Sequence, residues 1–99
     1  MRRGSTPTNT FEVDLDLTAA TIFVSYEQNG SIIIEKTGTD LTVTDESIEL
    51  TLTQEETLRF RPGEVLIQIR YVFPNGTADA SNIIRTTAER ILKDGVIEP

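Results

Sequence analysis

The stretch Glu64-Val-Leu-Ile-Gln-Ile-Arg-Tyr-Val-Phe73 decides how this chain folds. Its alternate residues place apolar side chains on one face: Val65, Ile67, Ile69, Tyr71 and Phe73. The opposite face mixes apolar and polar side chains: Leu66, Gln68, Arg70 and Val72. β-Branched and aromatic residues dominate, and no Gly or Pro interrupts the run. The pattern is typical of a strand in the middle of a sheet, with the rest of the chain supplying its neighbours.

Turn signals bound this strand on both sides. Arg61-Pro62-Gly63 precedes it, and Phe73-Pro74-Asn75-Gly76 fits a type I turn that ends with glycine in a left-handed bulge. We expect the chain to return as a last strand from Thr77 to about Thr87. The predicted register pairs apolar residues across this hairpin: Ile67 with Ile83, and Leu66 with Ile84.

Two earlier stretches also alternate with a period of two. The first is Phe11 to Leu17, where apolar residues face inward and Glu12, Asp14 and Asp16 form a wet, acidic face. Its inward residues are Phe11, Val13, Leu15 and Leu17. The second is Thr21 to Glu27, whose inward residues are Ile22, Val24 and Tyr26.

The Asn29-Gly30 pair turns the second of these strands into the apolar run Ile32-Ile33-Ile34. A two-residue turn there would pair Val24 with Glu35 and mix the two faces. A type I turn with Gly30 in a left-handed bulge keeps one face apolar, so it is the favoured register. It pairs Tyr26 with Ile32 and Val24 with Ile34, and it leaves Phe23 and Ile33 on the outer face.

The middle of the chain predicts two more strands and a helical turn. Leu41 and Val43 form a short strand, and Ile48 to Thr53 alternates apolar and polar residues after a turn at 45–47. Thr53-Gln54-Glu55-Glu56 then fits a capping box, with Thr at the cap and Glu three residues later. We therefore expect one helical turn over residues 54–58.

About seven short strands with turn signals every 8–12 residues predict an all-β, antiparallel, immunoglobulin-like β-sandwich. The likeness is loose, because the tight link at Asn29-Gly30 puts its two strands in one sheet. A true immunoglobulin domain splits the corresponding pair between sheets. We expect a flexible arm over residues 1–8, one sandwich domain over 9–90 and a tail over 91–99.

Composition limits the classes of partner. Sixteen acidic and nine basic residues give a net charge of −7, which disfavours nucleic acids and anionic membranes. No apolar run approaches the length of a membrane span, and the polar residues after Met1-Arg2-Arg3 do not resemble a signal peptide. We expect neither membrane nor nucleic-acid binding, and the absence of Cys is consistent with a reducing cytosol.

Residues for chemistry are scarce. The chain has no His and no Cys, which removes the commonest general bases, nucleophiles and transition-metal ligands. Glu12, Asp14 and Asp16 share a strand face, but neighbours two apart along a strand are about 7 Å apart, too far for one Ca²⁺ without a folded loop. We expect no catalytic residues, no metal and no cofactor, and hence no enzyme.

The outer face of the last hairpin is the candidate functional surface. It gathers Leu66, Val72, Ala80 and Ile84 around Arg70, and Phe23 and Ile33 extend it from the first hairpin. One interpretation is that the remaining strands or the tail cover this face. The other is a site for a partner subunit, because exposed apolar patches usually mark interfaces. A third interpretation is that the protein is a small carbohydrate- or surface-binding module in which the exposed ring of Phe23 contacts the ligand.

Four stretches support a resemblance: Arg3 to Thr8, Leu52 to Leu58, Ala80 to Ile84, and Ile91 to Ile97. They resemble a family of small proteins encoded in prophage-like structural gene clusters of gut Firmicutes. The strand plan is also similar to the amino-terminal immunoglobulin-like domain of phage baseplate upper proteins. These resemblances imply a non-enzymatic structural or adaptor protein of a tail or baseplate. They imply other phage structural proteins as partners and a place in a bacterial host cytoplasm or a virion. Weak self-association is also expected.

Overall fold

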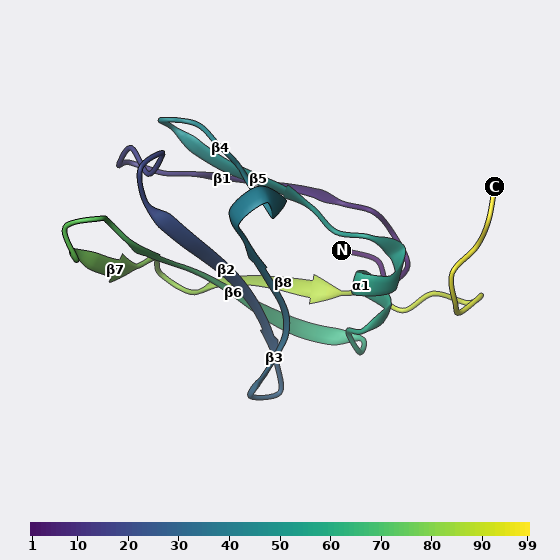
Figure 1. Ribbon diagram of the computed structural model, residues 1–99. Helices are drawn as coiled ribbons and strands as arrows, with labels where there is room; N and C mark the ends of the chain where they lie inside the picture. The colour runs from purple at the N-terminus through teal and green to yellow at the C-terminus, as the bar shows by residue number, and fades with distance from the viewer.

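The computed structural model describes residues 1–99 as two antiparallel sheets packed face to face (Figure 1). The smaller sheet has the order β1-β5-β4, with bounds Thr8–Glu12, Ser47–Thr51 and Thr42–Val43. The larger sheet has the order β3-β2-β6-β7, and β8 also pairs with β6. The bounds in the larger sheet are β2 Thr21–Gln28, β3 Ser31–Thr37, β6 Gly63–Val72, β7 Ala78–Ala80 and β8 Ile84–Ala88.

This strand order is that of an immunoglobulin-like sandwich, as predicted, with eight strands where about seven were expected. The smaller sheet matches strands B, E and D of that fold, and the larger one matches C′, C, F and G. The β2–β3 hairpin therefore corresponds to C and C′, which share a sheet in variable-type domains. The tight link at Asn29-Gly30 is thus compatible with the fold.

The predicted central strand is β6, and its apolar face lies in the core. Val65, Ile67 and Ile69 are all buried, as are the predicted inward residues of β2. The first strand is shorter than predicted because β1 ends at Glu12. Leu17 still reaches the core, whereas Leu15 is 49% exposed.

The helical turn forms where the capping box predicts it. Helix α1 spans Gln54–Leu58, and the Thr53 hydroxyl accepts a hydrogen bond from the Glu56 backbone N–H at 3.2 Å. The Glu56 carboxylate accepts one from the Thr53 backbone N–H at 2.9 Å. The helix brings Phe60 into the core, where its ring centroid lies 6.1 Å from that of Tyr26. A 3₁₀ turn over Gly38–Asp40 links β3 to β4 and was not expected.

The predicted register of the first hairpin is wrong. Asn29 and Gly30 both have positive φ, 53° and 82°, and form a two-residue turn that pairs Gln28 with Ser31. The faces are not mixed because a bulge follows: Glu27 pairs with Ile32, but Tyr26 pairs with Ile34. The bulge makes Ile33 the extra residue. Ile33 packs against the core, and Ile32 is the exposed residue at 59%.

The register of the last hairpin is wrong by one residue. The turn at Phe73–Gly76 is as predicted, with the Gly76 N–H donating to the Phe73 carbonyl and φ of 91° at Gly76. The return strand, however, is interrupted between β7 and β8. Ser81 fills the gap: its backbone N–H donates to the Ile69 carbonyl, and its hydroxyl accepts from the Ile69 N–H. The extra residue pairs Ile67 with Ile84 and Leu66 with Arg85.

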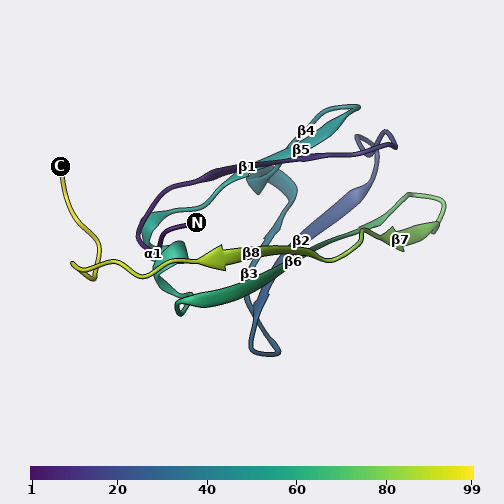
Figure 2. The same ribbon diagram turned by 180° about the vertical axis from the view of Figure 1, so that it is seen from behind.

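The first residues of the chain contact the domain, whereas the sequence suggested an arm without an anchor. The backbones of Met1 and Arg3 pair with residues 87–89, in a short parallel bridge. The Arg3 guanidinium donates to the carbonyls of Leu58 at 3.0 Å and Phe60 at 2.6 Å. Met1 packs against the core. Figure 2 shows the N-terminus beside α1 and β8, and the C-terminal tail extending beyond them.

Candidate functional site

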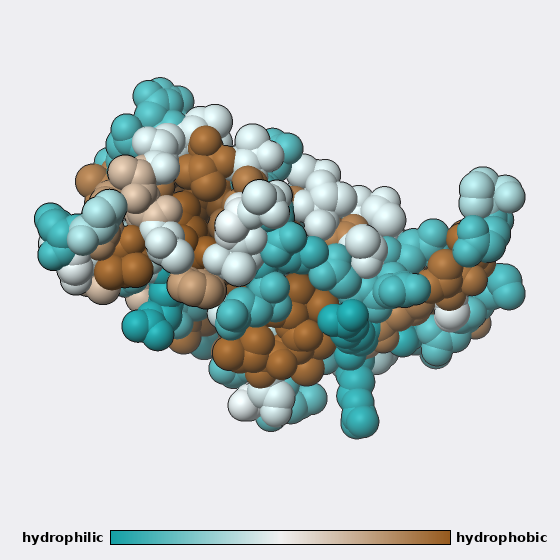
Figure 3. Space-filling view, in the orientation of Figure 1, coloured by the Kyte–Doolittle hydropathy of each residue, from teal (hydrophilic) through white to brown (hydrophobic).

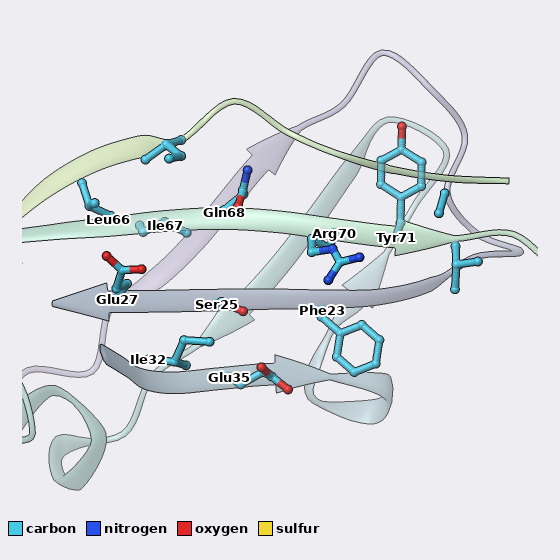
Figure 4. A pocket seen from close by; sticks show the side chains of 13 residues that line it. Phe23, Ser25, Glu27, Ile32, Glu35, Leu66, Ile67, Gln68, Arg70 and Tyr71 are labelled. Carbon is cyan, nitrogen blue, oxygen red and sulfur yellow. The ribbon is translucent and has the colours of Figure 1, made fainter. Parts of the chain in front are cut away.

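A groove of about 470 Å³ runs along the outer face of the larger sheet. Strands β2, β3 and β6 supply its floor, and their side chains appear in Figure 4. The apolar members of its lining that are exposed or half-buried are Phe23, Ile32, Leu66, Val72, Ala78 and Ile83. No residue of the tail lines the groove. Neither the smaller sheet nor the tail covers this face, so the interpretation of it as core does not hold.

Strand register sets the pattern of side chains in the groove. On β2 and β6, Phe23 lies opposite Arg70 and Ser25 opposite Gln68. Glu27 lies opposite Leu66 one step further along. Figure 4 shows Arg70 reaching from β6 toward β2, near Phe23. The centre of the groove, formed by Ser25 and Gln68, is therefore polar but uncharged. Apolar and charged side chains surround it.

The charged side chains in the groove lack partners within the chain. Four ion pairs form elsewhere, such as Arg85 with Glu64 at 2.9 Å, and none includes Arg70, Glu27 or Glu35. Arg70 also donates no side-chain hydrogen bond to another residue. A guanidinium beside exposed apolar side chains is a common anchor in protein interfaces.

Four of the predicted interface residues line this groove: Phe23, Leu66, Arg70 and Val72. The other three do not. Ile33 packs against the core. Ile84 pairs with Ile67 and so lies on the face opposite the groove, although it stays 38% exposed. Ala80 lies next to Arg70 on the outer face but outside the groove. The function of these residues stays a prediction.

The sequence reasoning did not place several of the lining residues on this face, among them Glu27, Ile32, Glu35 and Ile83. Two of them follow from the two bulges. Each bulge adds one residue to its strand, so Ile32 takes the place on the outer face predicted for Ile33, and Ile83 takes the place predicted for Ile84. A signal was present for the first exchange. Three consecutive isoleucines break the alternation of a regular strand, and Asn-Gly is the strongest marker of a two-residue turn. Together they favour a bulge in β3.

The surface also shows apolar side chains beyond this groove. Figure 3 shows them around β3 and at the end of the sandwich near β4 and β7. The exposed residues of the tail include Leu92, Val96 and Ile97. The tail is held to α1 by two hydrogen bonds between the Gln54 side chain and the backbone of Ile97.

The structure brings no acidic residues together as a metal site. No group of three or more His, Cys, Asp or Glu side chains is close enough to hold an ion. Asp16 instead accepts hydrogen bonds from the backbone N–H and the hydroxyl of Thr18, which lower the pKa of its carboxyl. Neither helical segment is long and apolar enough to cross a membrane.

Comparisons with known proteins identify no family for this chain. No protein-family model matches the chain, and no curated protein does. Among solved structures, the V domain of amphioxus IgVJ-C2 is similar at 16% identity and a TM-score of 0.38. That alignment covers 92% of this chain and 97% of the other.

Proposed function

We propose that this protein is a non-enzymatic structural or adaptor component of a phage-derived particle, associated with its tail or baseplate. It acts through protein–protein contacts made by the outer face of the larger sheet. The observation that carries the second part is an open apolar groove beside an arginine without an ion-pair partner. The resemblance of four stretches to prophage structural proteins supports the first part.

The chemistry of the groove fits a protein partner. Phe23 is 37% exposed and Val72 is 36% exposed, so about a third of each residue is open to a partner. Exposed apolar surface of this kind marks contact sites, and interfaces combine it with arginine and aromatic anchors. The proposed partners are other phage structural proteins, met in the host cytoplasm and retained in the virion.

A small carbohydrate is the competing occupant, because about 470 Å³ lies within the range of small-ligand sites. Phe23 is the aromatic residue whose side chain stands on the outer face of β2. A glycan array separates the two functions. A reproducible wild-type signal that disappears in Phe23→Ala would favour the carbohydrate. A wild type that binds no glycan on the array would favour the protein partner.

Particle association tests the proposed function. Particles released from an induced host that carries the gene are purified and probed for the wild type, Val72→Asp and Glu49→Ala. Val72 lies in the groove, whereas Glu49 is exposed on β5 in the other sheet. We expect the wild type and Glu49→Ala to travel with the particles and Val72→Asp to be lost. Absence of the wild type from the particles, or equal retention of Val72→Asp, would contradict the proposal.

A further inference from the structure

We propose that the groove binds a second copy of this chain, so that two outer faces pack against each other about a two-fold axis. This inference rests on the proposed function, because it names the partner of the same surface. The pattern of charge across β2 and β6 carries it.

The Ser25–Gln68 pair lies at the centre of that pattern. Glu27 lies two residues from it along β2, and Arg70 lies two residues from it along β6, in the opposite direction. The acid and the base therefore occupy one diagonal about the centre. Phe23 and Leu66 occupy the other diagonal, so each charged residue has an apolar residue directly across the ladder.

The two-fold axis lies in the plane of the interface, passes through the centre and is perpendicular to the line from Glu27 to Arg70. Rotation about this axis exchanges the positions of Glu27 and Arg70. It places Arg70 of one copy over Glu27 of the other, and the same pair forms a second time by symmetry. The rotation carries Phe23 toward β3 of the other copy, where Ile32 is exposed, and Leu66 toward Ile83. Arg70 and Glu27 thus meet opposite charges, whereas Glu35, which pairs with Ser25 from β3, gains no opposite charge from this rotation.

The size of the face indicates how strong this dimer is. Four strands at about 4.8 Å spacing and some seven residues at about 3.4 Å rise give a patch of roughly 450 Å² per copy. Two such patches bury about 900 Å², below the standard interface of about 1,600 Å². Each copy also has a net charge of −7. We therefore expect a weak, reversible dimer, which suits a component that assembles at high local concentration.

Charge reversal tests the symmetry directly by sedimentation equilibrium. Arg70→Glu places Glu opposite Glu27, and Glu27→Arg places Arg opposite Arg70, so each variant alone loses at least about tenfold in association. An equimolar mixture of the two variants restores both attractive pairs in a mixed dimer. We expect that mixture, and the double variant alone, to associate about as strongly as the wild type.

Matched controls change the same charge elsewhere. Arg90→Glu lies after β8, Glu12→Arg lies on β1 in the other sheet, and both positions are exposed. These two should associate as the wild type does, and circular dichroism should show every variant folded.

A wild type that stays monomeric at millimolar concentration, or a mixture of the two variants that does not regain association, would overturn the dimer. If particle retention still depends on Val72, the proposed function stands with another partner. If the dimer forms but no particle holds it, the proposed function alone fails.

Discussion

The ammonium nitrogen of Lys36 lies 2.7 Å from one carboxylate oxygen of Glu56 and 2.9 Å from the other. Lys36 belongs to β3, at the edge of the larger sheet, and Glu56 belongs to α1, which leads out of the smaller sheet. Both side chains are largely buried, at 13% and 16% exposure. The same carboxylate accepts the Thr53 N–H of the capping box. The ion pair thus joins the larger sheet to the helix that follows β5.

This pair makes stability depend on acid. Burial raises the pKa of Glu56, but hydrogen bonds from Lys36 and the Thr53 N–H outweigh burial and hold the pKa below its usual value. A carboxyl with a lowered pKa stabilises the fold fully above the ordinary glutamate pKa of about 4.3. That contribution is lost as the pH falls through the lower pKa of the folded state.

Glu56→Gln tests this contribution. The amide oxygen can still accept from Thr53, but Lys36 loses its counter-charge, so we expect a loss of about 1–3 kcal/mol at pH 7. Denaturant unfolding at pH 7 and pH 3 measures it. The difference between variant and wild type should shrink at the lower pH. An equal difference at both pH values would show that the charge of Glu56 is not the cause.

Removal of residues 1–7 should lower stability, although the sequence alone predicted a flexible arm over residues 1–8. The deletion removes the backbone bonds of Met1 and Arg3 to residues 87–89, and the bonds from the Arg3 side chain to the carbonyls of Leu58 and Phe60. We expect the melting temperature to fall by more than about 5 °C, which corresponds to at least about 1 kcal/mol. Deletion of residues 98–99, which are exposed, is the control. Identical melting curves for the two deletions would show that the N-terminal contacts add nothing.

Ile67→Ala should cost roughly 2–5 kcal/mol, because Ile67 lies in the middle of β6 and is only 4% exposed. Glu49→Ala, at an exposed position on β5, should stay within about 0.5 kcal/mol. Denaturant titration of both variants measures the contrast. Similar losses of unfolding free energy in the two variants would mean that the face of β6 that carries Ile67 is not the core face.

Val72→Asp distinguishes surface from core in the groove itself. Val72 is 36% exposed at the end of β6, so the new carboxylate can stay hydrated and the fold should persist. We expect a far-UV circular dichroism spectrum like that of the wild type, together with lost association. An unfolded variant would mean that a buried, unpaired charge had been created, and hence that this face is core.

Alternation and turn signals in the sequence were enough to predict most of the fold. The inward residues of β2 and β6 and the capped turn at Thr53 depend on local patterns, which the structure reproduces. Two bulges were not predictable in the same way. The bulge at Ile33 had a local signal in the three isoleucines after Asn-Gly, which the predicted register did not use. The extra residue near Ser81 has no such signal, and its hydrogen bonds with Ile69 of the adjacent strand stabilise it.

The candidate site was predictable only in part for the same reason. Leu66, Arg70 and Val72 lie on one uninterrupted strand, so a period of two places them correctly. Ile33 and Ile84 lie beyond bulges, and a slip of one residue moves a side chain to the opposite face. The Lys36–Glu56 pair and the Arg3 contacts join residues far apart in the chain, and no local pattern marks them.

The central claim is that the protein makes its contacts through the outer face of the larger sheet, first of all with its own copies. A dilution series of the ¹⁵N-labelled protein, followed by amide NMR shifts, tests it most directly. Between about 1 mM and about 20 µM, a range that spans a weak dimer, the amides of Ser25, Gln68 and Arg70 should move together. Those of β1 and β5 should stay fixed. Shifts centred on β1 and β5, or no shifts at all, would contradict the claim.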